Sequence, residues 1–165
     1  MTVGKLWYDS ERKMERLDRN DGKVDPICGP LSNNATTPCS QLIREGKRYI
    51  VFHLLRKCCY CCDAEHGFGI MRRDWLRDAD FVGKEELRGQ DFYHWRNAPA
   101  DTDWWETIDG KHTPRRAMED SLLIKDFIMN TYSEEYIASS IFDLPSFCEN
   151  AKKCAAGTKC DLCPP

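Results

Sequence analysis

The run Cys58-Cys59-Tyr60-Cys61-Cys62 constrains the fold of this chain more than any other stretch. It holds four of the ten cysteines and follows the most hydrophobic strand-like run, residues 49–55. Directly adjacent cysteines bridge each other only with strain, so each member of the two adjacent pairs should have a different partner. On a strand, neighbouring side chains also point to opposite faces of the sheet. The run therefore predicts a structural junction at the end of a central strand.

The remaining cysteines lie in two groups, and an even total is typical of a disulfide framework. Cys28 and Cys39 flank a loop rich in Pro, Gly, Asn and Thr, which at least one disulfide should close. The C-terminal segment 148–165 carries Cys148, Cys154, Cys160 and Cys163. We expect several cysteines of the central run to bond to this tail and some to the Cys28/Cys39 loop. A bridge from run to tail would close a loop of about ninety residues, worth on the order of 4 kcal/mol.

Zinc is the alternative interpretation of the same cysteines. Cys59-x-x-Cys62 and Cys160-x-x-Cys163 could together form a tetrahedral site, although the two pairs are much farther apart than in compact zinc modules. A redox-active CxxC would instead need a helix N-terminus in a βαβ unit, which the pattern does not indicate. We therefore favour disulfides, which form in oxidising compartments.

A sequon, Asn34-Ala35-Thr36, lies in the loop between Cys28 and Cys39. Such acceptors belong in surface loops of secreted proteins, so Asn34 is the predicted glycosylation site. The first residues lack the apolar region of a signal peptide. The sequon and the cysteines nevertheless point to the extracellular space or the secretory lumen.

Strand-like patterns dominate the chain, and they predict a mainly β, α+β fold. Strands are expected at 5–8, 13–17, 48–56, 81–82 and 90–96, and a hairpin joins 104–108 to 113–118 through Asp109-Gly110. The 48–56 strand is apolar on both faces, which indicates a central strand. One or two helical turns are expected at 72–77 and a polar connection at 83–89, while 122–129 fits a strand and a helix equally well. We expect one β-sheet domain over residues 1–147, with the Cys-rich tail 148–165 packed on it.

Charge and motifs exclude several functions. The net charge is −3 and the pI about 5.8, unlike the basic surfaces of nucleic-acid-binding proteins. No apolar run reaches the roughly 20 residues of a transmembrane segment. Neither HExxH nor GxSxG occurs, and no other motif names a reaction. The residues themselves predict a non-enzymatic protein without a cofactor.

Aromatic residues are frequent on the expected strands. Core packing explains many of them, and exposed tryptophans could stack on sugars. A third explanation is a concave sheet whose inner face forms an apolar ligand pocket with few polar groups. The residues predicted to line that pocket are Trp7, Tyr49, Val51, Phe92, His94 and Trp104.

The order of motifs over residues 6–150 resembles that of the ependymin-related secreted proteins, and most closely a poorly characterised branch of that kind in plants and ciliates. The segments that carry the resemblance are 6–9 (LWYD), 46–55, 69–76 (GIMRRDWL), 79–83 (ADFVG), His94-Trp95, 104–107, Pro114 and 141–148 (IFDLPSFC). It implies a curved antiparallel sheet, like the half-barrel of bacterial lipoprotein carriers, around a hydrophobic cavity. It also implies export, disulfides, glycosylation, and calcium-linked or lipid-linked roles. The doubled CCxCC run and the Cys-rich tail exceed what these proteins usually carry.

We therefore expect a secreted, disulfide-rich, non-enzymatic binding protein with an apolar pocket for a lipid or another hydrophobic small molecule. The alternative is a structural or interaction subunit that binds another protein chain in a homo- or hetero-oligomeric assembly at the cell surface or outside the cell. An intracellular zinc-stabilised module is the third interpretation.

Overall fold

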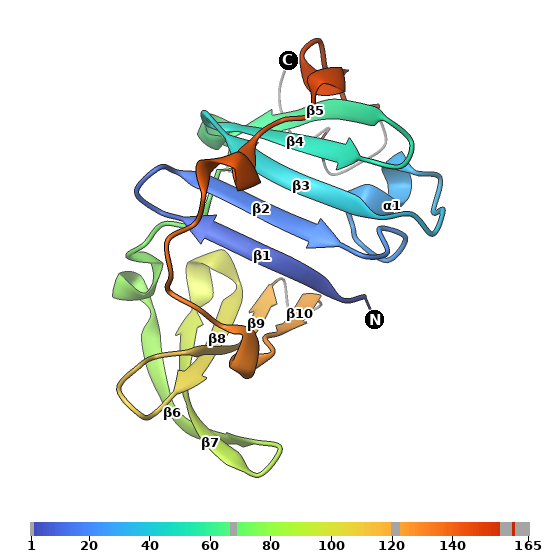
Figure 1. Cartoon of the computed structure of the whole chain (residues 1–165). Helices are drawn as coiled ribbons and strands as arrows, with labels where there is room; N and C mark the ends of the chain where they lie inside the picture. Colours follow the sequence, from blue (N-terminus) through green and yellow to red (C-terminus); the bar gives the residue numbers. More distant parts are fainter. Residues whose placement is uncertain (1, 67–68, 120–122, 156–159, 161–165) are drawn as a thin grey trace. The chain divides into compact units, whose positions relative to one another are not determined.

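The computed structural model describes residues 2–66, 69–119, 123–155 and 160 (Figure 1). The chain forms two compact units, one of residues 1–72 with 137–165 and one of residues 73–136. Each unit contains one sheet, so the strands divide between two sheets where we expected one. The predicted mainly β fold with short helices and a disulfide-bonded tail is confirmed.

The first sheet has six strands in the order β1-β2-β3-β4-β5-β11, and all pairs are antiparallel except β11 with β5. Its strands are β1 (Gly4–Asp9), β2 (Met14–Arg19), β3 (Cys39–Arg44), β4 (Lys47–Phe52), β5 (Lys57–Asp63) and β11 (Lys152–Lys153). Helical turns in this unit are α1 (Cys28–Leu31), η1 (Ala64–His66), η5 (Ser139–Phe142) and η6 (Ser146–Cys148).

The second sheet is an antiparallel meander of five strands in the order β10-β9-β8-β7-β6. Its strands are β6 (Asp80–Leu87), β7 (Gln90–Asn97), β8 (Thr102–Thr107), β9 (Pro114–Glu119) and β10 (Leu123–Asp126). The 3₁₀ turns of this unit are η2 (Trp75–Asp78), η3 (Ala98–Ala100) and η4 (Met129–Thr131). The hairpin around Asp109-Gly110 is confirmed, and the ambiguous 122–129 run contains a strand, β10.

Two expectations about strand ends were wrong. The apolar strand ends at Phe52, and residues 53–56 form a turn in which Arg56 adopts a left-handed conformation (φ 48°). The cysteine run is therefore a strand of its own, β5. Residues 83–87, expected as a polar connection, continue β6, and the chain reverses at Arg88-Gly89 with both residues at positive φ. Charged side chains suit an edge strand such as β6 because they discourage pairing with other chains.

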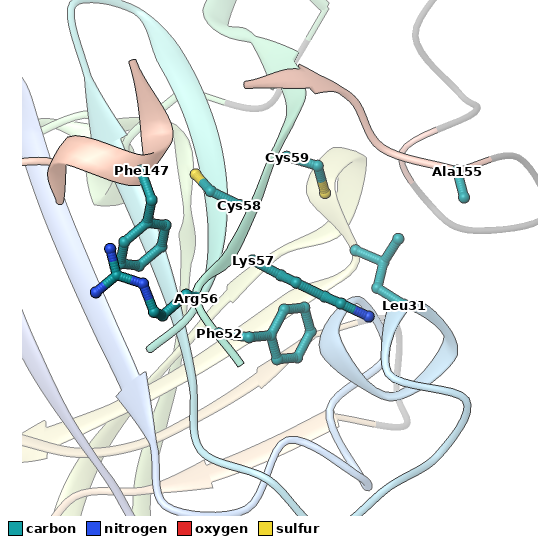
Figure 2. A pocket seen from close by; sticks show the side chains of 8 residues that line it. All are labelled: Leu31, Phe52, Arg56, Lys57, Cys58, Cys59, Phe147 and Ala155. Carbon is teal, nitrogen blue, oxygen red and sulfur yellow. The ribbon is translucent and has the colours of Figure 1, made fainter. Parts of the chain in front are cut away.

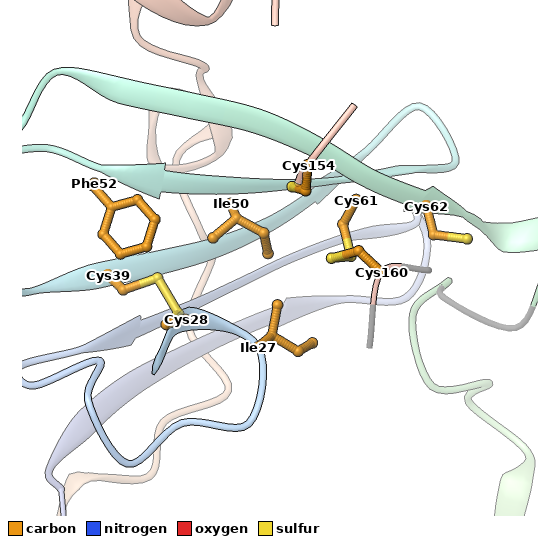
Figure 3. Packing of buried hydrophobic residues seen from close by; sticks show 9 residues of the cluster. All are labelled: Ile27, Cys28, Cys39, Ile50, Phe52, Cys61, Cys62, Cys154 and Cys160. Carbon is orange, nitrogen blue, oxygen red and sulfur yellow. A yellow bond between two sulfur atoms is a disulfide. The ribbon is translucent and has the colours of Figure 1, made fainter. Parts of the chain in front are cut away.

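The core of the first unit lies against both faces of β4, as the apolar pattern predicted. Ile50 and Val51 are fully buried and point to opposite faces. On the Ile50 face of β4 the side chains belong to the buried cluster shown in Figure 3. Its members are Ile27, Cys28, Cys39, Ile50, Phe52, Cys61, Cys62, Cys154 and Cys160. Near the other side of the sheet, segment 137–148 returns to this unit and buries Phe142 and Cys148.

Candidate functional site

The disulfides of the central run reach the tail, as predicted. Cys58 bonds to Cys148, Cys59 to Cys154 and Cys61 to Cys160, across sequence separations of 90, 95 and 99 residues. Adjacent Cys58 and Cys59 thus have different partners. β11 adds hydrogen bonds at the same place, since it pairs with Cys59 and Tyr60, and the Cys154 N–H donates to the Tyr60 carbonyl at 2.8 Å.

One part of the predicted pairing was wrong. Cys28 bonds to Cys39, so the 24–40 loop is closed on itself and is not bonded to the central run. The loop does not need a bridge to β5, because Asp25 already anchors it to β3 through Gln41. Cys62 is disulfide-bonded too, and Cys163 lies outside the described residues.

A bulge modifies the expected alternation in β5. Arg48 of β4 pairs with Cys62 and the next residue, Tyr49, pairs with Tyr60, so the register passes over Cys61. An extra residue of this kind changes the direction in which following side chains point. As a result, neighbouring Cys61 and Cys62 both belong to the same buried cluster (Figure 3).

These disulfides bear on the zinc alternative. Cys59 and Cys160 belong to two different disulfides and so offer no thiolate in this form of the protein. Within the described ranges, one cluster has the composition of a metal site, namely Cys62, Asp63 and His66. Because Cys62 is oxidised and Asp63 Oδ1 is paired with His66 Nδ1 at 2.6 Å, this cluster offers a poor ligand set for zinc or calcium.

The six predicted pocket residues divide between the two units. Trp7 (β1), Tyr49 (β4) and Val51 (β4) belong to the first sheet, where Val51 is fully buried and the Tyr49 ring lies 6.0 Å from that of Tyr60. Lys5 and Arg16 place their cationic groups 4.7 and 5.5 Å from the Trp7 ring.

Phe92, His94 and Trp104 belong to the second sheet. Phe92 and His94 share one face by alternation along β7. Trp104 lies on the other face because it pairs with Trp95. The structure therefore does not bring the six residues together, and none of them lines either of the two hollows described below.

His94 takes part in a network of charged groups. Its ring stacks on Trp105 at 4.3 Å, its Nε2 lies 2.8 Å from Asp103, and its Nδ1 lies 3.1 Å from Glu85. Asp103, which is buried, also pairs with Arg96. Each group in this network has an opposite charge or a hydrogen-bond partner, so the network accounts for the buried charge of Asp103 without a ligand.

The first hollow has a volume of about 370 Å³ and lies at the turn between β4 and β5 (Figure 2). Phe52, Leu31 and Phe147 supply apolar surface, and Arg56 and Lys57 supply positive charge. The full lining is Leu31, Phe52, Arg56, Lys57, Cys58, Cys59, Phe147 and Ala155. Disulfides Cys58–Cys148 and Cys59–Cys154 hold its walls together, because they bond β5 to the segments that carry Phe147 and Ala155.

The turn beside this hollow is unusually exposed. Leu54 is 75% exposed and Leu55 47%, although both belong to the most apolar run of the sequence. The Arg56 guanidinium lies 5.5 Å from the Phe147 ring, and in the described part of the chain neither Arg56 nor Lys57 forms an ion pair with an acid. The hollow thus combines an apolar wall with two positive charges that are not neutralised by the described residues.

The second hollow, about 270 Å³, is lined by four rings of the second unit: Phe81, Tyr93, Trp95 and His112. Pairing of β6 with β7 places Phe81 opposite Trp95, and the β8–β9 hairpin supplies His112. Below these rings lies Glu106, which is 5% exposed. Its carboxylate accepts from Trp95 Nε1 at 3.0 Å, Trp104 Nε1 at 3.3 Å and His112 Nδ1 at 2.8 Å.

Sequence reasoning missed both hollows. The first is made of residues from four separate segments, and no local pattern relates Leu31 to Phe147. For the second there was a signal, since Tyr93 and Trp95 alternate on one predicted strand face. The missing information was the register that adds Phe81 and the position of Glu106 beneath them.

No family model and no curated protein matches this chain. Among solved structures, it is similar to an uncharacterized conserved protein from Thermus thermophilus, with a TM-score of 0.49 and 7% sequence identity. The match covers 92% of this chain and 80% of that chain. In the described part of the chain, no helix is both long enough and apolar enough to cross a membrane.

Proposed function

We propose that this protein is a secreted, non-enzymatic binding protein that takes up a lipid-like anion, an acyl chain with a negatively charged head, in the hollow at the β4–β5 turn. The observation that carries the proposal is the pairing of apolar and basic lining in one place. Leu31, Phe52 and Phe147 would contact the chain, and Arg56 and Lys57 would bind the head.

The size and chemistry of the hollow suit such a ligand. A volume of about 370 Å³ is at the lower end for small-molecule sites, whose lining is mostly apolar with a few polar groups that fix orientation. An arginine fork matches a carboxylate or phosphate head in geometry as well as charge. The disulfide framework supports an extracellular location, because disulfides persist in oxidising compartments.

A chain-length series tests this function. Acetate, hexanoate, octanoate and decanoate are titrated into the disulfide-bonded protein by calorimetry. Each methylene that enters the hollow should tighten binding about fourfold, from about 0.8 kcal/mol per buried CH₂. Equal, weak binding of all four acids would reject the proposal.

Charge reversal tests the role of the basic pair. Arg56→Glu combined with Lys57→Glu should weaken decanoate binding at least tenfold. Lys13→Glu combined with Lys23→Glu, which reverses the charge of two exposed residues of the same unit, is the matched control and should leave binding unchanged. A loss of similar size in the control would mean that net charge, not the hollow, controls binding.

A second candidate function, an interaction subunit of an extracellular assembly, rests on a different observation. The second unit exposes several large apolar side chains: Phe81 52%, Val82 58%, Ile124 54% and Ile128 60%. Exposed apolar surface of this kind is typical of protein interfaces when it is contiguous. Sedimentation of the purified protein decides between the two: a stable oligomer that acidic ligands do not affect would favour this candidate.

A further inference from the structure

We propose that the rings of Phe81, Tyr93, Trp95 and His112 form a binding site for a trimethylammonium group. This site belongs to the second unit, whereas the acyl-anion hollow belongs to the first, so the two proposals stand on different residues.

The geometry is that of rings that meet at an angle. The Phe81 ring lies 5.6 Å from Tyr93 at 77° and 5.0 Å from Trp95 at 55°. The Tyr93 ring also faces His112 at 6.5 Å. Phe81 is 52% exposed, so the cluster is open to solvent. The four rings line one hollow of about 270 Å³, and a methylated ammonium ion in that hollow would contact their electron-rich surfaces as in an aromatic cage.

The rings of this cluster are not already used by a protein cation. Elsewhere in the chain Lys or Arg lies within 6 Å of aromatic rings, for instance Arg16 over Trp7, Arg115 over Phe92 and Arg116 over Trp105. Among the residues that the structure describes, no Lys or Arg lies over Phe81, Tyr93 or Trp95. No described lysine or arginine therefore competes with a ligand cation for the rings that line this hollow.

Glu106 makes the site selective for positive charge. The other buried carboxylates have arginine partners: Asp25 pairs with Arg19, and Asp103 with Arg96. Glu106 instead accepts three ring N–H groups, and within the described ranges no Lys or Arg pairs with it. Trp95 and His112 both bond to Glu106 and both line the hollow, so the negative charge of its carboxylate lies directly behind the rings when the His112 imidazole is neutral.

The same contacts favour a quaternary cation over a primary amine. A primary ammonium brings three N–H donors that must be satisfied when water is removed. The Glu106 carboxylate is engaged by the two indoles and His112, and carbon ring faces are weak acceptors. A trimethylammonium group has no N–H donor, so it loses less on leaving water and gains from the rings and from the charge behind them.

Choline is the probe, and 3,3-dimethylbutan-1-ol is its neutral isostere. Binding is followed by the indole N–H signals of the five tryptophans in ¹H–¹⁵N spectra, with the Trp95 signal identified from Trp95→Phe. We expect choline to shift the Trp95 signal saturably, with an affinity at least tenfold above that of the isostere. Glycerophosphocholine and trimethyllysine, titrated in parallel, show whether a lipid headgroup or a modified side chain is the better source of the group.

Variants separate the site from general effects. Phe81→Ala should lower choline affinity about threefold to tenfold, and Tyr132→Ala, which removes another exposed ring of the same unit, should not change it. Glu106→Gln should lower the affinity for choline but not for the isostere. Unchanged dispersion of the remaining amide signals shows that each variant is folded.

The proposal is overturned if choline leaves the Trp95 signal in place, or if the isostere or methyl glucoside binds as well as choline. Those last two outcomes would identify an apolar or sugar-stacking surface. None of these results depends on fatty-acid binding, which the calorimetric series measures separately.

Discussion

Both carboxylate oxygens of Asp25 lie 3.0 Å from one nitrogen, Nε2 of Gln41. The same carboxylate accepts the backbone N–H groups of Ile27 and Cys28 at 2.9 and 3.0 Å, and Arg19 pairs with it at 3.2 Å. Asp25 is only 4% exposed, so these partners replace water. This contact fixes the loop before α1 to the centre of the first sheet.

Replacing Asp25 by Ala should therefore destabilise the protein by about 3–5 kcal/mol, because it leaves a partly buried arginine and several donors unpaired. Urea unfolding with the disulfides intact measures this. The matched control is Asp143→Ala, which breaks an ion pair with Arg44 where the Asp143 side chain is 65% exposed. Exposed pairs contribute about 0–1 kcal/mol. A cost below about 1 kcal/mol for Asp25→Ala would contradict the account.

Removing one tail disulfide should lower the free energy of unfolding by less than its sequence separation suggests. Cys59–Cys154 spans 95 residues, but Cys58–Cys148 and Cys61–Cys160 close nearly the same loop on either side of it. With those two intact, Cys59–Cys154 closes a loop of only about eight residues, through 58–59 and 148–154, worth about 2.5 kcal/mol in the chain-entropy model. Cys59→Ser with Cys154→Ser, studied by thermal unfolding, should show this loss. Removing all three disulfides together should lower the free energy of unfolding by more than removing this one. Equal losses would contradict the view that the three disulfides constrain the same loop jointly.

Asp9 should contribute stability that depends on pH. The Arg12 backbone N–H donates to it at 2.8 Å and the guanidinium at 2.6 Å, and these contacts hold the pKa of Asp9 below its usual value. The stabilisation is therefore complete above the unfolded-state pKa, about 3.9, and is lost as the pH falls through the lower folded-state value. The difference in unfolding free energy between the wild type and Asp9→Asn should be constant near neutral pH and shrink in acid. A difference that does not change with pH would exclude Asp9 as its source.

Asn34 should carry a glycan when the chain passes through a eukaryotic secretory pathway. Asn34, Ala35 and Thr36 are all exposed, and Asn34 adopts a left-handed conformation (φ 56°) in an irregular loop, which leaves the sequon accessible. Mass spectrometry before and after amidase treatment should locate one glycan there, and Thr36→Ala should abolish it. Full secretion of an unglycosylated wild-type chain would count against this site.

The Asp109-Gly110 hairpin and the position of β4 follow from local rules. Gly110 adopts φ 78°, which a glycine tolerates, and a strand with Ile50 and Val51 buried on opposite faces must be an inner strand. The different partners of Cys58 and Cys59 follow from geometry in the same way. These features could be predicted because each depends on a few neighbouring residues.

The predicted ligand residues show where such rules end. Phe92 and Trp104 were both expected as inward-facing aromatic residues, yet the register of β7 with β8 places them on opposite faces of the second sheet. Trp7 and Val51 belong to another sheet altogether. The register of β7 with β8 depends on the conformation of the connection 98–101, and a shift of one residue reverses every side chain.

The sequence by itself determined that this chain is a β protein whose cysteine run is bonded to its tail, because strand alternation and disulfide geometry act locally. The tertiary structure alone decided that Cys61 and Cys62 enter one core, since the bulge at Cys61 arises from the pairing of β5 with β4. It also decided that Phe81, Trp95 and His112 gather over Glu106. That arrangement requires three strands in register and a turn, and no single segment carries the information for it.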